Sequence, residues 1–292
     1  MRPGLTTALI GAMPAVFVLI WSTGFVVARL GMPHAPPFTF LAWRFLFSIG
    51  VIGAWVALSR NIAWPRSRRQ WAHLAVVGTL LHGGYLGGVW AAIKAGMPAG
   101  LAALIVCLQP VLTAVWLSWR GTGHHVSARQ WLGLLLGLGG LVLVLWRGMS
   151  GGSVSVEQVL LAVAALISIT VGTLYQKRYL GPADVRAASL MQLTAALVAT
   201  LPLAWAETGS LHWHPELIAA MAWSVLGMTL GGSSLLYLLI QRGAATEVTS
   251  LFYLVPPCTA LLAWLAFAEP LTLVMLFGML LCAIGVYLVR RE

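Results

Sequence analysis

Ten apolar runs, each about twenty residues long, cover almost the whole chain and constrain its fold more than any other feature. A run of ~20 apolar residues can cross a bilayer as an α-helix. Lipid offers backbone groups no hydrogen-bond partner, so the spanning segments must be helical, and long continuous runs disfavour an outer-membrane barrel. The predicted runs are 9–30, 37–58, 72–93, 98–119, 128–147, 156–176, 186–205, 217–240, 247–268 and 271–289. The sequence therefore predicts an all-α membrane protein with ten transmembrane helices.

Composition supports the same class. Only 8% of the 292 residues are charged and 60% are hydrophobic, whereas about 25% are charged in a typical soluble domain. The net charge of +10 comes from arginines in short connections, a pattern of membrane orientation rather than of nucleic-acid binding. Cys107, Cys258 and Cys282 lie inside apolar runs without metal-ligand spacing. We expect one integral membrane unit, monomeric, surrounded by lipid, without a cleaved signal peptide, cofactor, metal or nucleic-acid partner.

The basic residues predict the orientation of the chain. If the N-terminus is cytoplasmic, thirteen of the 17 Lys and Arg residues lie in cytoplasmic segments, and the outer loops hold only Arg29, Lys94 and Arg147. Arg44 lies inside a span. The cytoplasmic set is Arg2, Arg60, Arg66, Arg68, Arg69, Arg120, Arg129, Lys177, Arg178, Arg186, Arg242, Arg290 and Arg291. By the positive-inside rule, both termini of this multi-pass protein face the cytoplasm.

The two halves of the chain resemble each other. Matching pairs are Ser127–Gly133–Gly140 with Thr272–Gly278–Gly285, Pro110 with Pro256, Gly24 with Gly172, and Gly83-Gly84 with Gly231-Gly232. Five spans are an odd number, so the second copy must cross the membrane in the opposite sense. This predicts two inverted-topology repeats, residues 1–150 and 151–292, an architecture of secondary transporters with a midplane site. The alternative is chance similarity between glycine-rich apolar helices.

The third span is the first candidate for a cavity wall. His82 lies ten residues after Ala72, which places it ~15 Å into the membrane. Gly78, His82 and Tyr85 share one helix face, and glycines at 83, 84, 87 and 88 form two overlapping GxxxG pairs on another face. Ionisable groups at membrane mid-depth usually mark a pathway. The alternative is a histidine that only hydrogen-bonds a neighbouring helix.

Other spans carry weaker candidates. Ser233, Tyr237 and Gln241 form a polar stripe on the eighth span, where interhelical hydrogen bonding is the competing interpretation. Pro110, beside Gln109, and Pro256 lie halfway along two spans and predict paired helix kinks, with simple curvature as the alternative. Further cavity candidates are Trp21, Tyr175 and Tyr253, for which interfacial aromatic belts compete.

Arg44 is the one arginine well inside a predicted span. It lies seven residues after Pro37, ~10 Å from the outer end. It can either extend to the headgroups or face the cavity and hold a carboxylate in a bidentate pair.

Carboxylates are absent from the middle of every predicted span, so the proton relay usual in drug/proton antiporters is missing. His82 is the only central group that titrates near neutrality, which favours facilitated diffusion over proton coupling. No GxxxxGK[ST] loop is present. The core also lacks paired carboxylates and a Ser/His pair, which argues against an intramembrane enzyme. His124-His125, His212 and His214 lie in loops, where solvated side chains are expected rather than metal ligands.

The chain resembles the drug/metabolite transporter superfamily of the EamA type, and within it the YddG-type aromatic amino-acid exporters. The motifs that carry the likeness are Trp21-Ser-Thr-Gly, Trp43-Arg44-Phe45, the helices with Pro110 and Pro256, and Glu269-Pro-Leu-Thr before Gly278 and Gly285. The resemblance implies a bacterial inner-membrane carrier with a central cavity that exports amino acids and related metabolites by alternating access. In one departure, the first repeat has His124 where the second has Glu269.

We therefore expect a carrier that exports small amphipathic metabolites, in particular aromatic or hydrophobic amino acids, by facilitated diffusion. Arg44 would bind the carboxylate, and His82, Tyr85, Tyr237 and Trp21 would line the cavity. The alternatives are another cargo on the same fold (a sugar, a nucleotide-sugar or a drug) and proton-coupled export.

Overall fold

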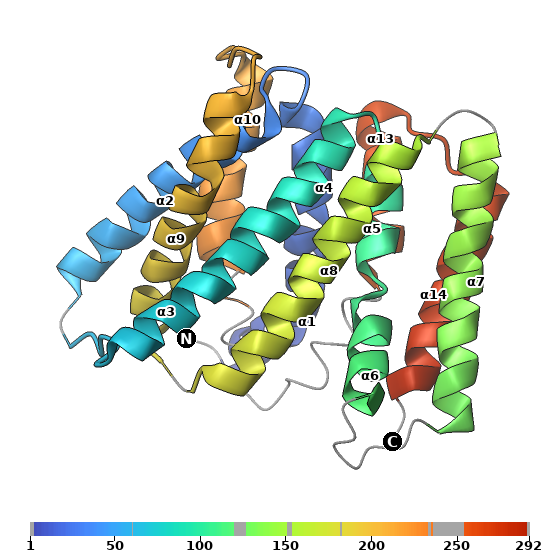
Figure 1. The fold of residues 1–292 in the computed structure, drawn as a ribbon, viewed down its shortest axis with the longest axis horizontal. Coiled ribbons are helices and arrows are strands. Elements are labelled where there is room, and N and C mark those ends of the chain that lie inside the picture. Colours follow the sequence, from blue (N-terminus) through green and yellow to red (C-terminus); the bar gives the residue numbers. More distant parts are fainter. Residues whose placement is uncertain are drawn as a thin grey trace. The chain divides into compact units, whose positions relative to one another are not determined.

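The computed structural model describes residues 3–59, 61–119, 127–150, 154–181, 183–232, 235 and 254–290. All regular elements within these ranges are helices (Figure 1). Five of them are long and apolar enough to cross a membrane: Ala12–Gly31, Pro37–Leu58, Arg68–Lys94, Val156–Tyr179 and Val185–Ala206. Shorter apolar helices account for much of the remainder. The predicted all-α class is confirmed for the described part of the chain.

The helices gather into two compact units, each with its own packing. Unit 1 comprises Met1–Ala28, Pro98–Ser153 and Ala222–Glu292, and unit 2 comprises Arg29–Met97 and Val154–Met221. Each unit therefore takes segments from both halves of the sequence. The predicted division at residue 150 follows sequence similarity rather than contacts, and it stays a prediction.

In unit 2, α2 (Pro37–Leu58) packs along α9 (Val185–Ala206). The first turn of α2 is hydrogen-bonded to Glu207, the residue that caps the end of α9. The start of one helix therefore meets the end of the other, and the pair is antiparallel (Figure 1). Pro37 begins α2, where its missing N–H needs no partner.

A second part of unit 2 is a long continuous helix that changes from α- to π-helical and back to α-helical. It consists of α3 (Arg68–Gly78), the π-helical segment η1 (Thr79–Gly84) and α4 (Tyr85–Lys94). Its partner is α8 (Val156–Tyr179). A methyl group on Gly88 would lie 2.7 Å from the carbonyl oxygen of Leu161, and Gly84 packs directly on Ser168. The predicted role of these glycines in close helix contact is confirmed.

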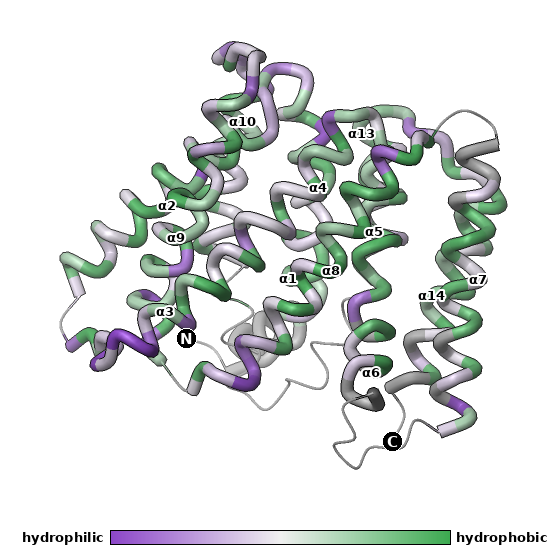
Figure 2. The backbone as a smooth tube through the Cα atoms, viewed as in Figure 1, coloured by the Kyte–Doolittle hydropathy of each residue, from purple (hydrophilic) through white to green (hydrophobic). Residues whose placement is uncertain are grey.

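Unit 1 contains a helix pair built on glycines. In it, α7 (Ala128–Ser150) packs along α14 (Leu273–Arg290). Gly140 meets Gly278, where an added methyl group would lie 2.7 Å from the Gly278 carbonyl oxygen, and Gly133 meets Gly285. Residue numbers increase along α7 where they decrease along α14, so this pair is also antiparallel. Figure 2 shows that hydrophobic residues follow both helices, and side chains such as Leu135 and Phe277 are exposed, as expected for contact with lipid.

The remainder of unit 1 includes the residues of α1 (Pro3–Gly31) up to Ala28, with α5 (Ala99–Val106), α6 (Gln109–Trp119), η2 (Trp223–Gly232) and α13 (Val255–Phe267). Glu269 accepts a hydrogen bond from the backbone N–H of Ala99 at 3.1 Å and so caps the start of α5. In unit 2, α10 (Pro215–Ala222) follows the connection after α9, and its residues up to Met221 belong to that unit.

Most predicted bounds agree with the helices to within a few residues. The predicted span 98–119 is divided into α5 and α6 by a turn at Cys107 and Leu108. The predicted 217–240 span begins as α10 and continues as the π-helical η2. Both π segments contain glycines that the predicted repeat pairs with each other, Gly84 and Gly232.

Side-chain caps explain where several helices begin. Ser67 with Gln70, and Ser155 with Gln158, form reciprocal capping boxes at α3 and α8. At α9, Asp184 accepts a hydrogen bond from the backbone N–H of Arg186 and binds its guanidinium at 2.7 Å. The side-chain hydrogen bond from Arg186 is the main reason why the pKa of Asp184 falls to about 2.

Candidate functional site

Arg44 is buried in unit 2, with 7% of its surface exposed. Its guanidinium carbon lies 5.9 Å from the ring centre of Trp90 on α4, within the range of a cation–π contact. The Trp90 ring in turn stacks on Phe40 at 4.4 Å. The Nε atom of Arg44 is buried and has no hydrogen-bond partner among the described residues. A buried guanidinium with an open donor is costly unless a ligand completes its pairing.

His82 lies in the π-helical segment η1, within electrostatic range of this arginine. π-Helical turns inside α-helices occur frequently at functional sites. The His82 side chain lies next to that of Gln192 on α9, and its ring lies 6.3 Å from Phe45 in an edge-on arrangement. Gly78, one turn earlier, packs directly on the backbone of Gln192. Gly78 and His82 therefore both face α9, as their predicted shared face requires.

Tyr85 completes the group. It is 7% exposed and lies within electrostatic range of Arg44, as does His82. We call Arg44, His82, Tyr85 and Trp90 the Arg44 cluster. It combines one permanent cation, one imidazole and two aromatic rings inside a membrane helix bundle. Such a set can hold a carboxylate through Arg44 and an aromatic group through the rings.

Tyr175 lies elsewhere in the same unit. Its hydroxyl is 2.8 Å from Nδ1 of His73, which lies nine residues before His82, ~13 Å along the helix. The His73 ring also stacks on Tyr179 at 4.9 Å. The structure therefore places Tyr175 in a separate aromatic group between α3 and α8.

Two further candidates belong to unit 1. Trp21 is half-buried and packs against Phe17, with ring centres 5.4 Å apart. Gln109 begins α6, and its carbonyl oxygen accepts a hydrogen bond from the Thr113 hydroxyl at 2.9 Å.

The two prolines predicted to kink helices occupy equivalent positions near helix starts. Pro110 is the second residue of α6 and Pro256 is the second residue of α13. A proline is tolerated in the first turn because its missing N–H would have no partner there. Whether they bend a helix around a site stays a prediction.

The remaining candidates lie outside the described residues. They are Ser233, Tyr237, Gln241 and Tyr253.

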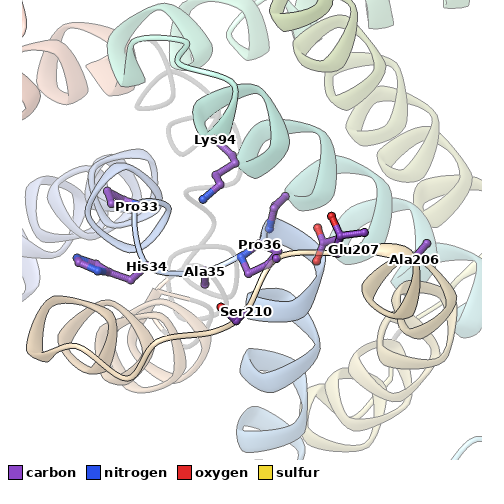
Figure 3. A pocket seen from close by; sticks show the side chains of 11 residues that line it. Pro33, His34, Ala35, Pro36, Lys94, Ala206, Glu207 and Ser210 are labelled. Carbon is purple, nitrogen blue, oxygen red and sulfur yellow. The ribbon is translucent and has the colours of Figure 1, made fainter.

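A cavity of about 350 Å³ lies in unit 2 (Figure 3), and its lining does not include the residues of the Arg44 cluster. Its lining comes from the connection after α1, the end of α4 and the connection after α9. Lys94 donates a hydrogen bond to the backbone carbonyl of Met32 at 2.6 Å. Glu207 is committed to the first turn of α2. Lys94 thus holds the connection after α1 to α4, and Glu207 holds the connection after α9 to α2.

The sequence interpretation missed Trp90 and Gln192 as neighbours of the candidate site. Trp90 is a large aromatic residue on the same span as His82 and Tyr85, which was the available signal. Gln192 is a polar residue in the middle of the predicted span 186–205, which was a usable signal. The capping role of Glu207 had no local signal, because its partners Phe38 and Thr39 are distant in the sequence.

Comparison with known proteins gives consistent matches over the whole chain. Residues 8–146 and 157–291 each match the EamA-like transporter family. An uncharacterized transporter, YvbV of Bacillus subtilis, is 30% identical over 99% of this chain and 93% of its own. A probable amino-acid metabolite efflux pump of Salmonella typhimurium is 25% identical over 95% of this chain and 93% of its own. The uncharacterized inner membrane transporter YedA of Escherichia coli K12 is 26% identical over 96% of this chain and 92% of its own.

A protein of known crystal structure has the same fold, with a TM-score of 0.66 over 95% of each chain at 21% identity. Together with the apolar helices, these matches identify a multi-pass membrane transporter. The chain belongs to the EamA-like transporter family.

Proposed function

We propose that this transporter exports small amphipathic metabolites, in particular aromatic or hydrophobic amino acids, and that Arg44 binds their carboxylate. The observation that carries the proposal is the buried Arg44 guanidinium, whose Nε has no hydrogen-bond partner in the part of the chain that the structure describes. A carboxylate can accept two parallel hydrogen bonds from a guanidinium. The burial of Arg44 favours this role over extension to the headgroups.

The neighbours of Arg44 favour an aromatic or apolar substrate body. Trp90 and Tyr85 present aromatic rings that an apolar group can contact, and His82, beside Gln192, presents a polar edge. The relative from Salmonella typhimurium, named a probable amino-acid metabolite efflux pump, supports the same substrate class. Tyr175, Trp21, Gln109, Ser233, Tyr237, Gln241 and Tyr253 remain proposed substrate contacts, and Pro110 and Pro256 remain proposed hinges.

Alternating access between two inverted five-helix repeats, residues 1–150 and 151–292, is the proposed mechanism. Three observations support it: the family matches twice in succession, helices from equivalent positions pair antiparallel, and both π segments contain glycines that the two halves share. The complete carrier would have ten spans, both termini in the cytoplasm of a bacterium and its helices in the inner membrane, acting as a monomer.

Facilitated diffusion is the proposed energetic mode, because the predicted spans contain no carboxylate at mid-depth. Proton-coupled export is the second candidate, and His82 is the observation that favours it, since it is an ionisable group beside the proposed substrate site. A different cargo on the same fold, such as a sugar, nucleotide-sugar or drug, is the alternative to amino acids.

Uptake into proteoliposomes tests the proposal. Purified protein is reconstituted, and entry of labelled phenylalanine or tryptophan is measured with and without a pH gradient. We expect saturable uptake without a gradient. Uptake only with a gradient would select proton coupling, and no uptake by folded protein would reject aromatic amino acids as the cargo.

A further inference from the structure

Two connections in unit 2 bring histidines and a glutamate together away from the Arg44 cluster. His34 follows α1, whereas His212, His214 and Glu216 lie between α9 and the first turn of α10. The sequence alone suggested solvated loop histidines. We propose that His34, His214 and Glu216 form a binding site for a borderline transition-metal cation, with zinc as its representative, independent of the exported solute.

The ligand atoms already converge. His34 Nε2 lies 2.6 Å from Glu216 Oε2, and His214 Nδ1 lies 3.8 Å from the same oxygen. One potential ligand atom from each residue lies within 4.8 Å of the others. In a tetrahedral zinc site with bonds of ~2.0–2.1 Å, ligand atoms are separated by about 3.4 Å. The observed spacings bracket that value, so small side-chain movements can place a cation between the three groups.

The chemistry of the three groups selects the class of metal. Two imidazoles and one carboxylate are ligands preferred by Zn²⁺, Cu²⁺ and Ni²⁺, whereas Ca²⁺ and Mg²⁺ require oxygen ligands. A His₂Glu set also leaves a fourth position for water, a common zinc arrangement.

One rearrangement is needed, and the structure leaves room for it. The rings of His34 and His214 are stacked with centres 4.4 Å apart and planes 10° apart. A cation must lie near the plane of each ring, so His214 has to rotate. Its side chain is 52% exposed, and its Nδ1 accepts only a long 3.4 Å contact from the Glu216 backbone N–H.

The backbone fixes the site in place. The N–H of His212 donates to the carbonyl oxygen of His34 at 2.9 Å, which joins the two connections directly. His34 also lines the cavity of Figure 3, together with residues 33–37 and 206–210. A bound cation would therefore join the connection that carries His34, one wall of that cavity, to the first turn of α10.

Zinc titration of the purified, tag-free protein tests the site. Isothermal calorimetry on metal-stripped protein should show one zinc per chain. His34→Gln, His214→Gln and Glu216→Gln should each weaken binding at least tenfold. X-ray absorption at the zinc edge should report two imidazole ligands in the unaltered protein and one in His214→Gln.

His73→Gln is the matched control, because His73 is a histidine of the same unit that lies with Tyr175 instead. It should bind zinc with unchanged affinity. The glutamine substitutions keep a hydrogen-bonding side chain, and an unchanged unfolding temperature without metal verifies that each variant folds. Equal zinc affinity in the three variants and the control, or no measurable zinc binding by the unaltered protein, would overturn the proposal.

Discussion

Glu207 accepts two hydrogen bonds from Thr39, one from its backbone N–H and one from its hydroxyl, each 2.8 Å long. The other carboxylate oxygen accepts the backbone N–H of Phe38 at 2.9 Å. The first N–H groups of a helix have no intrahelical partner, and the positive end of the helix dipole attracts an anion. Glu207 thus caps α2 from 168 residues away in sequence and locks the start of α2 to the end of α9.

Removing this cap should destabilise unit 2. We expect Glu207→Ala to lower the free energy of unfolding by about 1–2 kcal/mol, the usual scale for losing a helix cap. The change can be measured as a lower unfolding temperature in detergent. Glu157→Gln, an exposed glutamate in the first turn of α8, is the control. An equal effect in both variants would contradict the capping role.

Arg44 should be required for carboxylate-bearing substrates. Arg44→Lys keeps a cation but loses the planar fork that pairs with a carboxylate, so we expect uptake of phenylalanine to fall at least tenfold, as in Arg44→Gln. Phenylethylamine lacks the carboxylate. The fraction of phenylalanine uptake that it inhibits should therefore change little between these variants and the unaltered protein. If Arg44→Lys transports phenylalanine normally, bidentate pairing is not used.

The contact of α4 with α8 should tolerate no added side chain at Gly88. A methyl group there would lie 2.7 Å from the Leu161 carbonyl oxygen and 2.9 Å from Ala165 Cβ. Overpacking of this kind costs about 1–3 kcal/mol. Gly53→Ala is the matched control, because, apart from the nearby backbone of its own helix, no atom of the described residues lies within 4 Å of the added methyl, and alanine favours a helix. Thermal unfolding should distinguish the two variants. The unfolding temperature should be lower for Gly88→Ala and unchanged or higher for Gly53→Ala.

Asp184 should stabilise the protein in a pH-dependent way. Its pKa in the folded state, about 2, is below the ordinary value of about 3.9. The contribution is therefore fully present above pH ~4–5 and is lost as the pH falls toward 2. Because water partly screens the ion pair with Arg186, we expect the Asp184 charge to contribute about 1 kcal/mol to the free energy of unfolding.

Asp184→Asn isolates this charge, since asparagine caps a helix as well as aspartate does. The unaltered protein should unfold at a higher temperature than Asp184→Asn at pH 6, and the difference should shrink at pH 3. A difference that stays constant across this range would show that the charge of Asp184 is not responsible.

The sequence predicted the local and periodic parts of this structure well. The bounds of α2, Pro37–Leu58, were predicted correctly because an N-terminal proline and a continuous apolar run define them locally. The contact made by Gly84 and Gly88 was predictable from their GxxxG spacing. The two π segments were not, because a π turn depends on how η1 fits against α8 and α9 rather than on local propensity.

The candidate site shows the same division. Arg44 and His82 could be singled out because a charged or polar group in an apolar span needs a reason, and their role as substrate contacts stays a prediction. Trp90 beside Arg44 and Gln192 beside His82 were missed, since tertiary packing decides which residues of α2, α4 and α9 meet. The cluster of His34, His214 and Glu216 was likewise invisible, because it joins positions 182 residues apart.

The contact between α7 and α14 joins equivalent surfaces of the two halves. Gly133 and Gly140 of one helix face Gly285 and Gly278 of the other, and these are the positions that the two halves share. Each half therefore contributes the same glycine surface to the contact, and the contact is self-complementary. Two copies of one such helix would fit each other in the same antiparallel way, as in the interface of a symmetric dimer.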